Sequence, residues 1–418
     1  MEATDSYIFT QKQKEGLSSW IICLSASLFP LFAFIQMNLL NVLSTDILKG
    51  FSINERQLST LSAMYVYADA IFLIPAGLLF DRYRTQNMLI LGFTLSILGT
   101  VLFANSYTLL IASIARFVSG FGHAFALIGC FKLVSDLFHD RRQAFLIGLT
   151  ITIAMFGGML AQTPLAFLNQ TVGWRKAVWI DAIFGILILI ALFSIFSFNR
   201  EPKKRNQERL NISLCINNLK LAFKNSQNWL CGLYVCCLSL PLMILGALWG
   251  SSYLISRHNL SAVDASFVTM MVFLGTIIGS PVWGWLSDYT NKQKIFMVVG
   301  AVFSLLLVLV ILYINNLSVT QLIVLFFSLG GFSSAQVLGY PAIAENSPAE
   351  YRSTSMGFAN VIMMAGAATL QLLYGVALSS KNFLDISGSN NYQLAMYIFP
   401  IAFIASIIFA CFIKKKSF

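Results

Sequence analysis

Charged side chains are scarce in this chain of 418 residues, of which only 11% are Asp, Glu, Lys or Arg. A soluble domain carries about 25% charged residues, so the composition argues against a soluble globular enzyme. The mean hydropathy of +0.76 points the same way. The 27 basic residues outnumber the 17 acidic ones, but they lie between apolar runs. The excess therefore indicates membrane topology rather than binding to nucleic acid.

Motifs for bound groups are lacking as well. The sequence has no nucleotide-binding loop, no metal-ligand spacing and no pair of carboxylates suited to hydrolysis. The seven cysteines follow no metal-binding pattern, and Cys236 and Cys237 are adjacent, without the two intervening residues of a redox pair. We therefore expect no cofactor, no metal, no structural disulfide and no enzymatic activity.

Long apolar segments without charged residues make up most of the sequence. About 20 apolar residues span a bilayer, and the charge-free runs, with three nearly apolar segments, hold twelve such spans. The sequence thus predicts an all-α membrane protein embedded in the lipid bilayer. The expected helices start near Trp20, Leu58, Met88, Thr108, Ala144, Lys176, Trp229, Ala265, Ile295, Thr320, Arg352 and Tyr392.

Basic residues outside these helices predict the orientation. One set of loops, together with both termini, holds nineteen of them, whereas the opposite loops hold six. The richer side is cytoplasmic by the positive-inside rule, so both termini are expected in the cytoplasm. The first helix follows a polar segment without a small-residue cleavage site, and we interpret it as an uncleaved crossing.

The chain repeats itself at half its length. Gly77 and Asp81 recur as Gly284 and Asp288, 207 residues later. A second set recurs 209 residues later, pairing Asp136, Gly148 and Gly157 with Glu345, Gly357 and Gly366. We therefore expect two pseudo-symmetric six-helix bundles. The predicted divisions are an N-terminal tail at 1–19, bundles at 20–197 and 229–413, a cytoplasmic linker at 198–228 with a short surface helix at 211–224, and a C-terminal tail at 414–418.

Two six-helix repeats around a midplane site are a plan of transporters. The stretch from Gly77 to Arg82 has the form Gly-x-x-x-Asp-Arg, Arg116 is followed by Gly120 and Gly122, and Gly173-Trp174-Arg175 opens the sixth helix. In these motifs and in topology the chain resembles the major facilitator superfamily over nearly its whole length. The resemblance implies alternating-access transport of a small molecule.

The loop after the second helix is a candidate conformational latch. A carboxylate such as Asp81 can receive the amino-terminal amides of the helix that begins near Arg352, and in the family this contact closes the cytoplasmic side. The sequence departs from the family pattern at two positions. Arg84 stands where the family has a glycine, and in the second copy of the loop Tyr289 replaces the arginine. A solvated turn is the alternative. The expected latch residues are Gly77, Asp81, Arg82, Arg84, Asp136, Gly284, Asp288, Glu345 and Arg352.

Charges within the membrane are costly unless they are paired or face water. Asp69 and Arg116 lie ~16 Å and ~12 Å from the outer face at 1.5 Å per residue. Arg116 and His123 are seven residues apart and share a helix face. We predict that Asp69, Arg116 and His123 couple transport to protons. The alternatives are a purely structural pair between Asp69 and Arg116 and a neutral, hydrogen-bonded His123. Asp181, near the outer start of the sixth helix, is interpreted as interfacial.

Polar and aromatic residues on the expected cavity helices are candidate substrate ligands, although any one of them can instead bond a neighbouring helix. They are Gln36, Asn38, Tyr65, Arg116, Trp249, Tyr253, Gln336, Tyr340 and Gln371. The resemblance places the first, fourth, seventh and tenth helices around the cavity, which favours Gln36, Arg116, Trp249 and Gln336.

Function is predicted as proton-coupled uptake of a small polar metabolite such as an amino acid or a nucleoside. The Gly-Pro dipeptide usual in the fifth helix of drug antiporters is absent, and Tyr65, Tyr67, Pro75 and Gly77 resemble bacterial importers of the phagosomal transporter type. Export of a drug or siderophore-like compound, or a nontransporting nutrient sensor, are the alternatives. We expect a monomer in a bacterial cytoplasmic membrane, with a small-molecule substrate and protons as partners and no nucleic acid.

Overall fold

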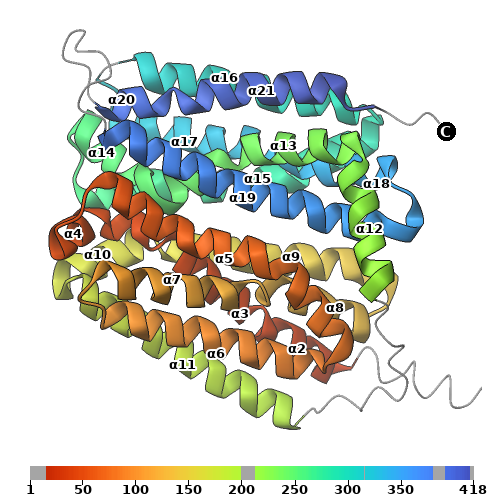
Figure 1. Cartoon of the computed structure of the whole chain (residues 1–418). Helices are drawn as coiled ribbons and strands as arrows, with labels where there is room; N and C mark the ends of the chain where they lie inside the picture. The colour runs from red at the N-terminus through yellow and green to blue at the C-terminus, as the bar shows by residue number, and fades with distance from the viewer. Residues whose placement is uncertain (1–15, 199–211, 315, 380–390, 415–418) are drawn as a thin grey trace, which may run out of the picture.

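The computed structural model describes residues 16–198, 212–314, 316–379 and 391–414. The predicted tails fall almost wholly outside these ranges, as does the first part of the linker. The side chain of the predicted latch residue Asp81 also lies outside the description. The described chain is helical, without strands, and contains 12 helices long and apolar enough to cross a membrane (Figure 1). The predicted all-α membrane fold is therefore confirmed.

Each predicted helix starts within four residues of the observed one. The N-terminal half consists of α2 (Leu17–Ala26), α3 (Leu28–Asn38), α4 (Leu40–Phe51), α5 (Glu55–Arg82), α6 (Thr85–Ala104), α7 (Leu109–His123), α8 (Ala126–Leu137), α9 (Asp140–Leu160), α10 (Thr163–Val172) and α11 (Trp174–Phe198). Polar caps explain several starts. The Asn54 side chain accepts from the Gln57 amide at the start of α5, and Thr108 accepts from Ile111 at the start of α7.

The C-terminal half begins after the short linker helix α12 (Ile212–Lys224), which the sequence predicted. It consists of α13 (Ser226–Leu240), the π-helix η1 (Pro241–Trp249), α14 (Gly250–His258), α15 (Ala262–Thr290), α16 (Gln293–Tyr313), α17 (Val319–Ser333), the 3₁₀ turn η2 (Ser334–Leu338), α18 (Gly339–Asn346), the 3₁₀ turn η3 (Ala349–Tyr351), α19 (Arg352–Ser379), α20 (Asn391–Met396) and α21 (Ile398–Phe412).

The four crossings expected to line the cavity are interrupted. The first breaks at Ser27 and Leu39, the fourth at 124–125, the seventh passes through η1, and the tenth passes through η2. By contrast, α5 and α19, which pack together across the two halves, are continuous. An interrupted helix leaves backbone N–H and C=O groups without their usual helical hydrogen bonds. Within the membrane such groups occur only where protein or water supplies a hydrogen-bond partner. These breaks therefore mark where polar contacts concentrate.

The two ends of the bundle differ in how the halves meet. We call the end where α5 finishes and α12 lies the linker face, and the end where α4 and α14 finish the distal face (Figure 1). One hydrophobic core joins residues of both halves, and its N-terminal members include Leu43, Leu58 and Trp174 near the distal face. A second core, which includes Phe80, Leu133 and Phe196, contains N-terminal residues alone. The halves thus share an apolar core on the distal side.

Close helix contacts repeat in both halves. A Cβ atom on Gly120 of α7 would collide with the Tyr65 carbonyl of α5, and one on Gly330 of α17 would collide with the Val272 carbonyl of α15. The paired positions are 210 and 207 residues apart, which matches the repeat of the sequence. Apolar side chains on the outside face lipid in this arrangement. On α11 Ile183, Leu187 and Ile190 are about half exposed along one face.

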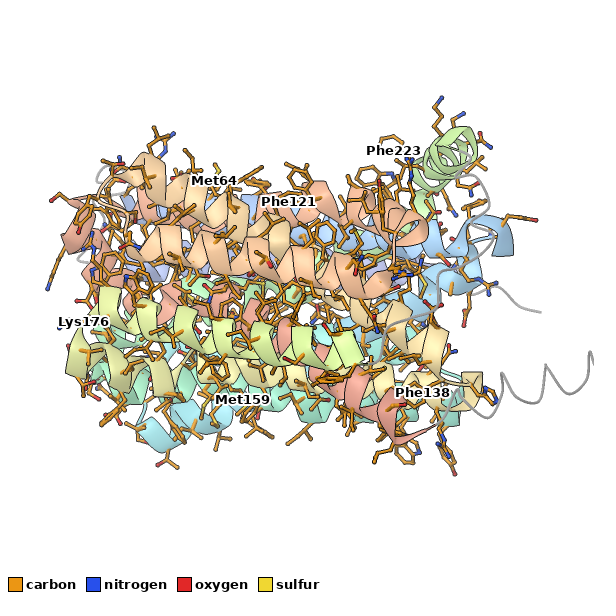
Figure 2. All side chains as sticks on the ribbon, turned by 90° about the horizontal axis from the view of Figure 1, so that it is seen from below. Met64, Phe121, Phe138, Met159, Lys176 and Phe223 are labelled. Carbon is orange, nitrogen blue, oxygen red and sulfur yellow. The ribbon has the colours of Figure 1, made fainter. Side chains whose placement is uncertain are left out.

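Figure 2 shows the bundle from below, with Lys176 at one end and Phe138 and Phe223 at the other. The helix α12, which carries Phe223, stands out from the bundle at its end. Its Phe223 ring packs edge-on against Trp229 and Phe358, with ring centroids 5.2 Å and 5.8 Å away. The linker helix is therefore anchored on the C-terminal half.

Candidate functional site

The candidate site is built where α5 and α7 approach each other. Because Gly120 has no side chain, α7 packs directly on the backbone of α5 at Tyr65. Tyr65 and Asp69 are one turn apart on α5, whereas Arg116 and His123 are two turns apart on α7. This glycine contact therefore brings all four side chains to one interface. The sequence predicted a shared face only for Arg116 and His123, and the structure adds Tyr65 and Asp69 from α5.

Arg116 is buried, with 1% of its surface exposed. Its Nη1 donates to the Gln36 carbonyl at 2.6 Å, and its guanidinium lies over the Tyr65 ring, 4.4 Å from the centroid. The carbonyl is available because α3 ends at Asn38 and the last turn of a helix lacks internal partners. A cation is also favourable at that end of the helix dipole. Nε and Nη2 have no hydrogen-bond partner among the described groups.

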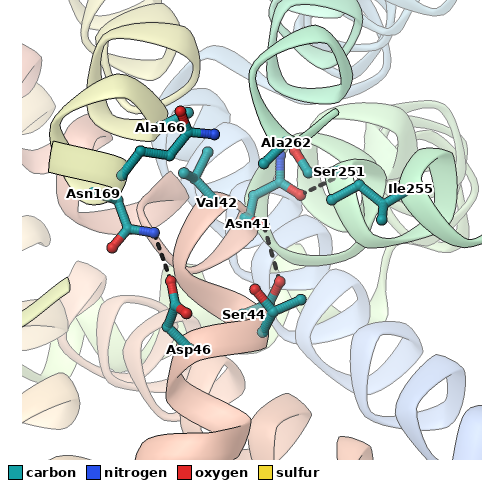
Figure 3. A pocket seen from close by; sticks show the side chains of 11 residues that line it. Asn41, Val42, Ser44, Asp46, Ala166, Asn169, Ser251, Ile255 and Ala262 are labelled. Carbon is teal, nitrogen blue, oxygen red and sulfur yellow. Dashed lines mark hydrogen bonds between the residues drawn. The ribbon is translucent and has the colours of Figure 1, made fainter. Parts of the chain in front are cut away.

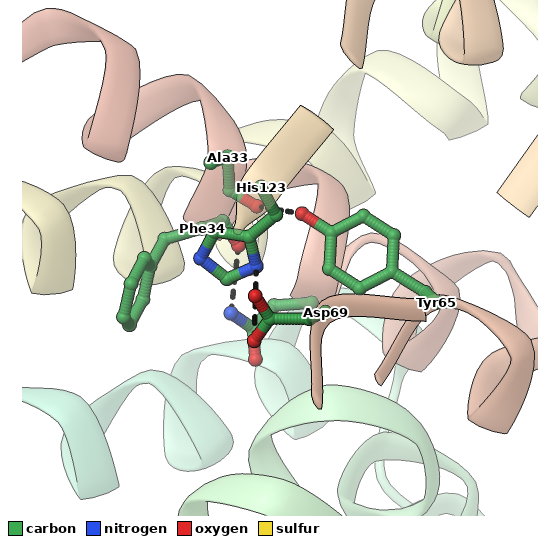
Figure 4. A network of polar contacts seen from close by, with 6 residues as sticks. Ala33, Phe34, Tyr65, Asp69 and His123 are labelled. Atoms are coloured by element: carbon green, nitrogen blue, oxygen red, sulfur yellow. Dashed lines mark hydrogen bonds and ion pairs between the residues drawn. The ribbon is translucent and has the colours of Figure 1, made fainter. Parts of the chain in front are cut away.

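Asp69 lies beside His123 rather than Arg116 (Figure 4). His123 Nδ1 and Asp69 Oδ2 are 3.9 Å apart, and both side chains are buried. Tyr65 completes the cluster by donating to the Ala33 carbonyl at 2.7 Å. No ion pair joins Asp69 to Arg116 among the described residues. The alternative of a purely structural Asp69–Arg116 pair is therefore not what the structure shows.

Asp181 of α11 was interpreted as interfacial from the sequence, and that interpretation is wrong. The residue is 9% exposed and its Oδ2 accepts a hydrogen bond from Gln36 Nε2. Gln36 thus contacts two buried charged residues. Its side-chain amide donates to the Asp181 carboxylate, and its carbonyl accepts from Arg116. The one signal in the sequence was an isolated Asp in an apolar helix, and nothing local identified its partner, which lies 145 residues away.

Asn38 also belongs to this region. Its Nδ2 donates to the Phe34 carbonyl one turn earlier at 2.7 Å, a local bond that often bends a helix. Its Oδ1 is buried without a partner. The end of α3 therefore offers an unused acceptor two residues from Gln36, whose carbonyl Arg116 bonds.

The candidate substrate ligands in the C-terminal half fall into two groups, which are packed aromatic residues of the seventh crossing and polar residues of the tenth and eleventh. Trp249 and Tyr253 are fully packed, because Trp249 stacks on Tyr374 with centroids 5.9 Å apart and Tyr253 donates to the Ile311 carbonyl at 3.2 Å. Gln371 donates to the Met243 carbonyl of η1 at 3.1 Å and keeps an unpartnered Oε1. Gln336 of η2 also has an unpartnered Oε1. Tyr340 donates to Asn360 Oδ1 at 3.3 Å.

Hydrogen bonds between the halves form what we call the distal seal, made of Asn41, Ser44, Gln162, Gly246, Ser251 and Ser252. Gln162 Nε2 donates to the Gly246 carbonyl at 3.0 Å, and the Ser251 amide donates to Asn41 Oδ1 at 2.9 Å. Asn41 Nδ2 donates to Gln162 Oε1 at 2.7 Å, which links these two contacts. Ser44 and Ser252 share a bond of 2.7 Å. The Gly246 carbonyl of η1, the Ser251 amide of α14 and a pair of serine hydroxyls thus join the two halves.

The latch residues lie at the linker face. Arg82, Asp288 and Arg352 are exposed there, and the Asp81 side chain lies outside the described residues. An added Cβ on Gly77, Gly148, Gly284 or Gly357 would meet no atom within 4 Å. These glycines lie on α5, α9, α15 and α19, the helices that pair across the halves. Open space therefore lies beside these four glycines, near the linker face.

No group of three or more His, Cys, Asp or Glu side chains that could hold a metal ion occurs in the described part of the chain. The buried polar atoms that remain without partners include two guanidinium nitrogens of Arg116, several side-chain amide oxygens and the Ser251 hydroxyl. Such groups bind small polar molecules directly.

Comparison with known proteins agrees with this reading of the fold. An uncharacterized transporter of Bacillus subtilis, YybO, is 22% identical over 97% of each chain. The probable galactarate/D-glucarate transporter GudP of the same organism is 21% identical over 88% of this chain and 87% of its own. A bacterial homolog of the human lysosomal transporter Spinster, solved inward-facing and unoccupied, superimposes with a TM-score of 0.73 at 15% identity over 95% of each chain.

Twelve spans in two repeated bundles with interrupted helices define an integral multi-pass membrane transporter rather than an enzyme. The model of the major facilitator superfamily matches residues 26–369 and 233–417. The chain belongs to the major facilitator superfamily.

Proposed function

We propose that this protein imports a small carboxylate-bearing metabolite by proton-coupled alternating access. The observation that carries the proposal is the buried Arg116, whose Nε and Nη2 lack partners. Leaving a buried donor unpaired costs about 1–3 kcal/mol and more for a charged group. A bound carboxylate relieves that cost with charge-assisted bonds.

Three buried amide oxygens without partners suit the remainder of such a substrate. Asn38, Gln336 and Gln371 each present an amide oxygen without a partner, from the first, tenth and eleventh crossings. A hydroxyl or ammonium group can donate to them, so an amino acid or a hydroxy acid fits better than a nucleoside, which lacks a carboxylate. The name of the relative GudP, a probable transporter of galactarate and D-glucarate, supports an acidic substrate.

Protons act in this proposal at the Asp69–His123 contact. Either side chain can take up a proton, and the gain or loss of that proton changes the charge of the buried contact. Arg116, Tyr65 and Asp181 are the other titratable groups that act electrostatically on this cluster. Protonation therefore changes the charge balance around the arginine that holds the substrate.

Orientation determines which side the distal seal closes. With the linker face in the cytoplasm of a bacterial cell, the distal seal closes the outer side in this conformation. Uptake requires that the seal open to load substrate and that the latch then close the cytoplasmic side. The superfamily relatives named above are bacterial, which supports the inner membrane as the location.

The test uses purified protein in liposomes. Counterflow of radiolabelled D-glucarate and of amino acids identifies the substrate, and an imposed inward proton gradient measures coupling. We expect Arg116→Ala to abolish counterflow, and Asp69→Asn to keep counterflow at symmetric pH while losing accumulation driven by the gradient. Binding without exchange, export from loaded vesicles, or indifference to the gradient would contradict the proposal.

A further inference from the structure

A cavity of about 350 Å³ opens at the distal face between the two halves (Figure 3). It is lined from α4, α10, α14 and the start of α15, and Asn41, Asp46, Asn169 and Ser251 contribute its central polar groups. None of the described residues that line it is Lys, Arg or His. The cavity thus differs in charge from the Arg116 region.

The hydrogen bonds inside the cavity leave acceptors unused. Asn169 Nδ2 donates to Asp46 Oδ2 at 2.6 Å, whereas Asn169 Oδ1 is buried without a partner. The Asp46 carboxylate has lone pairs beyond this one bond. Ser251 is 3% exposed, lines the cavity, and its Oγ has no partner. These acceptors can be satisfied by a ligand that donates hydrogen bonds.

The cavity is also joined to the distal seal. Asn41 and Ser251 line the cavity, and the bond between them is one of those that hold the halves together. Asn38, with its free amide oxygen, lies three residues before Asn41 on the first crossing, a rise of ~4.5 Å at 1.5 Å per residue. Opening of the seal would therefore connect the cavity with the region of Arg116.

We propose that this cavity is a second binding site, which takes an organic ammonium group or a polyhydroxylated molecule through Asp46, Asn169 and Ser251. Asp46 supplies the negative charge and the first acceptor, Asn169 supplies the neutral acceptor, and Ser251 bonds a hydroxyl. The site is occupied while the seal is closed, and it holds a ligand on the distal side of Asn41. It is independent of the carboxylate site at Arg116.

The experiment is a thermal-shift titration of the full-length protein in detergent with D-glucosamine, D-glucose and D-glucarate, at fixed ionic strength. A ligand that binds the folded state raises the apparent Tm. We expect D-glucosamine to protect the wild type and Arg116→Ala equally. Asp46→Asn should weaken its apparent Kd at least about tenfold, the loss of one charge-assisted bond of about 1.4 kcal/mol.

Two further variants separate binding from folding. Ser251→Ala removes a hydroxyl that bonds nothing in the protein, so it should leave the Tm without ligand unchanged and weaken D-glucosamine binding about threefold. Asp264→Asn is the matched control, because Asp264 is an exposed carboxylate at the start of α15 that bonds Ser261 and does not line the cavity. It should bind D-glucosamine like the wild type.

The outcomes distinguish this site from the transport site. Equal D-glucosamine binding in wild type, Asp46→Asn and Ser251→Ala overturns the proposal, as does protection by sodium chloride alone that depends on Asp46. No D-glucosamine or D-glucose binding to the wild type overturns it too. Loss of D-glucarate binding in Arg116→Ala but not in Asp46→Asn supports two sites. If D-glucarate fails to bind while D-glucosamine still depends on Asp46, the carboxylate proposal alone fails.

Discussion

Arg116 holds its place through one backbone bond and one ring contact, so its remaining donors are free to serve a ligand. Lysine carries the same charge but presents a single point of donation rather than a planar fork. We expect Arg116→Lys to keep the fold and to weaken substrate affinity about 10- to 100-fold, because a lost charge-assisted bond costs about 1.5–3 kcal/mol. Counterflow as a function of substrate concentration measures the half-saturation concentration, which reports this affinity. A wild-type half-saturation value would contradict the central role of Arg116.

Asp181 and Gln36 form the second residue-level test. Asp181→Asn keeps an oxygen for Gln36 to bond, whereas Asp181→Leu leaves the buried amide of Gln36 unsatisfied. We expect the asparagine variant to retain the wild-type Tm and the leucine variant to lose about 1–3 kcal/mol of stability. Thermal unfolding in detergent compares the two. Equal Tm values for both variants would show that the contact contributes nothing to stability.

At the scale of elements, the contact between α5 and α7 depends on the absence of a side chain at Gly120. A Cβ atom there collides with the Tyr65 carbonyl, and backbone atoms cannot rotate away as a side chain can. We expect Gly120→Ala to lower stability by about 1–3 kcal/mol and to reduce uptake by separating His123 from Asp69. Gly77→Ala is the control, because its Cβ meets nothing within 4 Å. Similar Tm values for the two variants would contradict this account.

The sequence predicted the helices well and their interruptions poorly. Bilayer thickness requires runs of about 20 apolar residues, and charges are excluded from those runs, so every crossing was found. The π-helix at Pro241–Trp249 gave no signal beyond its proline, and the 3₁₀ turn at Ser334–Leu338 gave none. Such breaks depend on partners elsewhere in the fold, such as Gln162 and Gln371, which bond carbonyls of η1.

The same limit applies to the candidate site. Helical spacing predicted that Arg116 and His123 share a face, because that relation is local to one helix. The choice of His123 as the neighbour of Asp69 depends on how two helices rotate against each other, which spacing does not determine. The bonds of Asp181 and Asn41 join residues more than 100 positions apart. The assignment of these residues to substrate and protons stays a prediction.

At the scale of the whole molecule, transport requires the distal seal to open. Ser44 and Ser252 face each other across the halves at 2.7 Å, close enough for cysteines at both positions to form a disulfide. We expect oxidation of the Ser44→Cys/Ser252→Cys double variant to stop counterflow and a reducing agent to restore it. The single Ser44→Cys variant is the control and should be insensitive to oxidant. Full counterflow by the cross-linked protein would contradict alternating access through this seal.

The distal seal is made of serine hydroxyls, two side-chain amides and backbone groups, all of them neutral. Its bonds carry no net charge through the membrane field, so the membrane potential does almost no work on them. Ionic strength, which screens only charges, has little to act on there either. The energy that opens the distal side must therefore arrive from elsewhere in the molecule. In the proposed mechanism it arises where a proton or a substrate carboxylate changes the charge around Arg116.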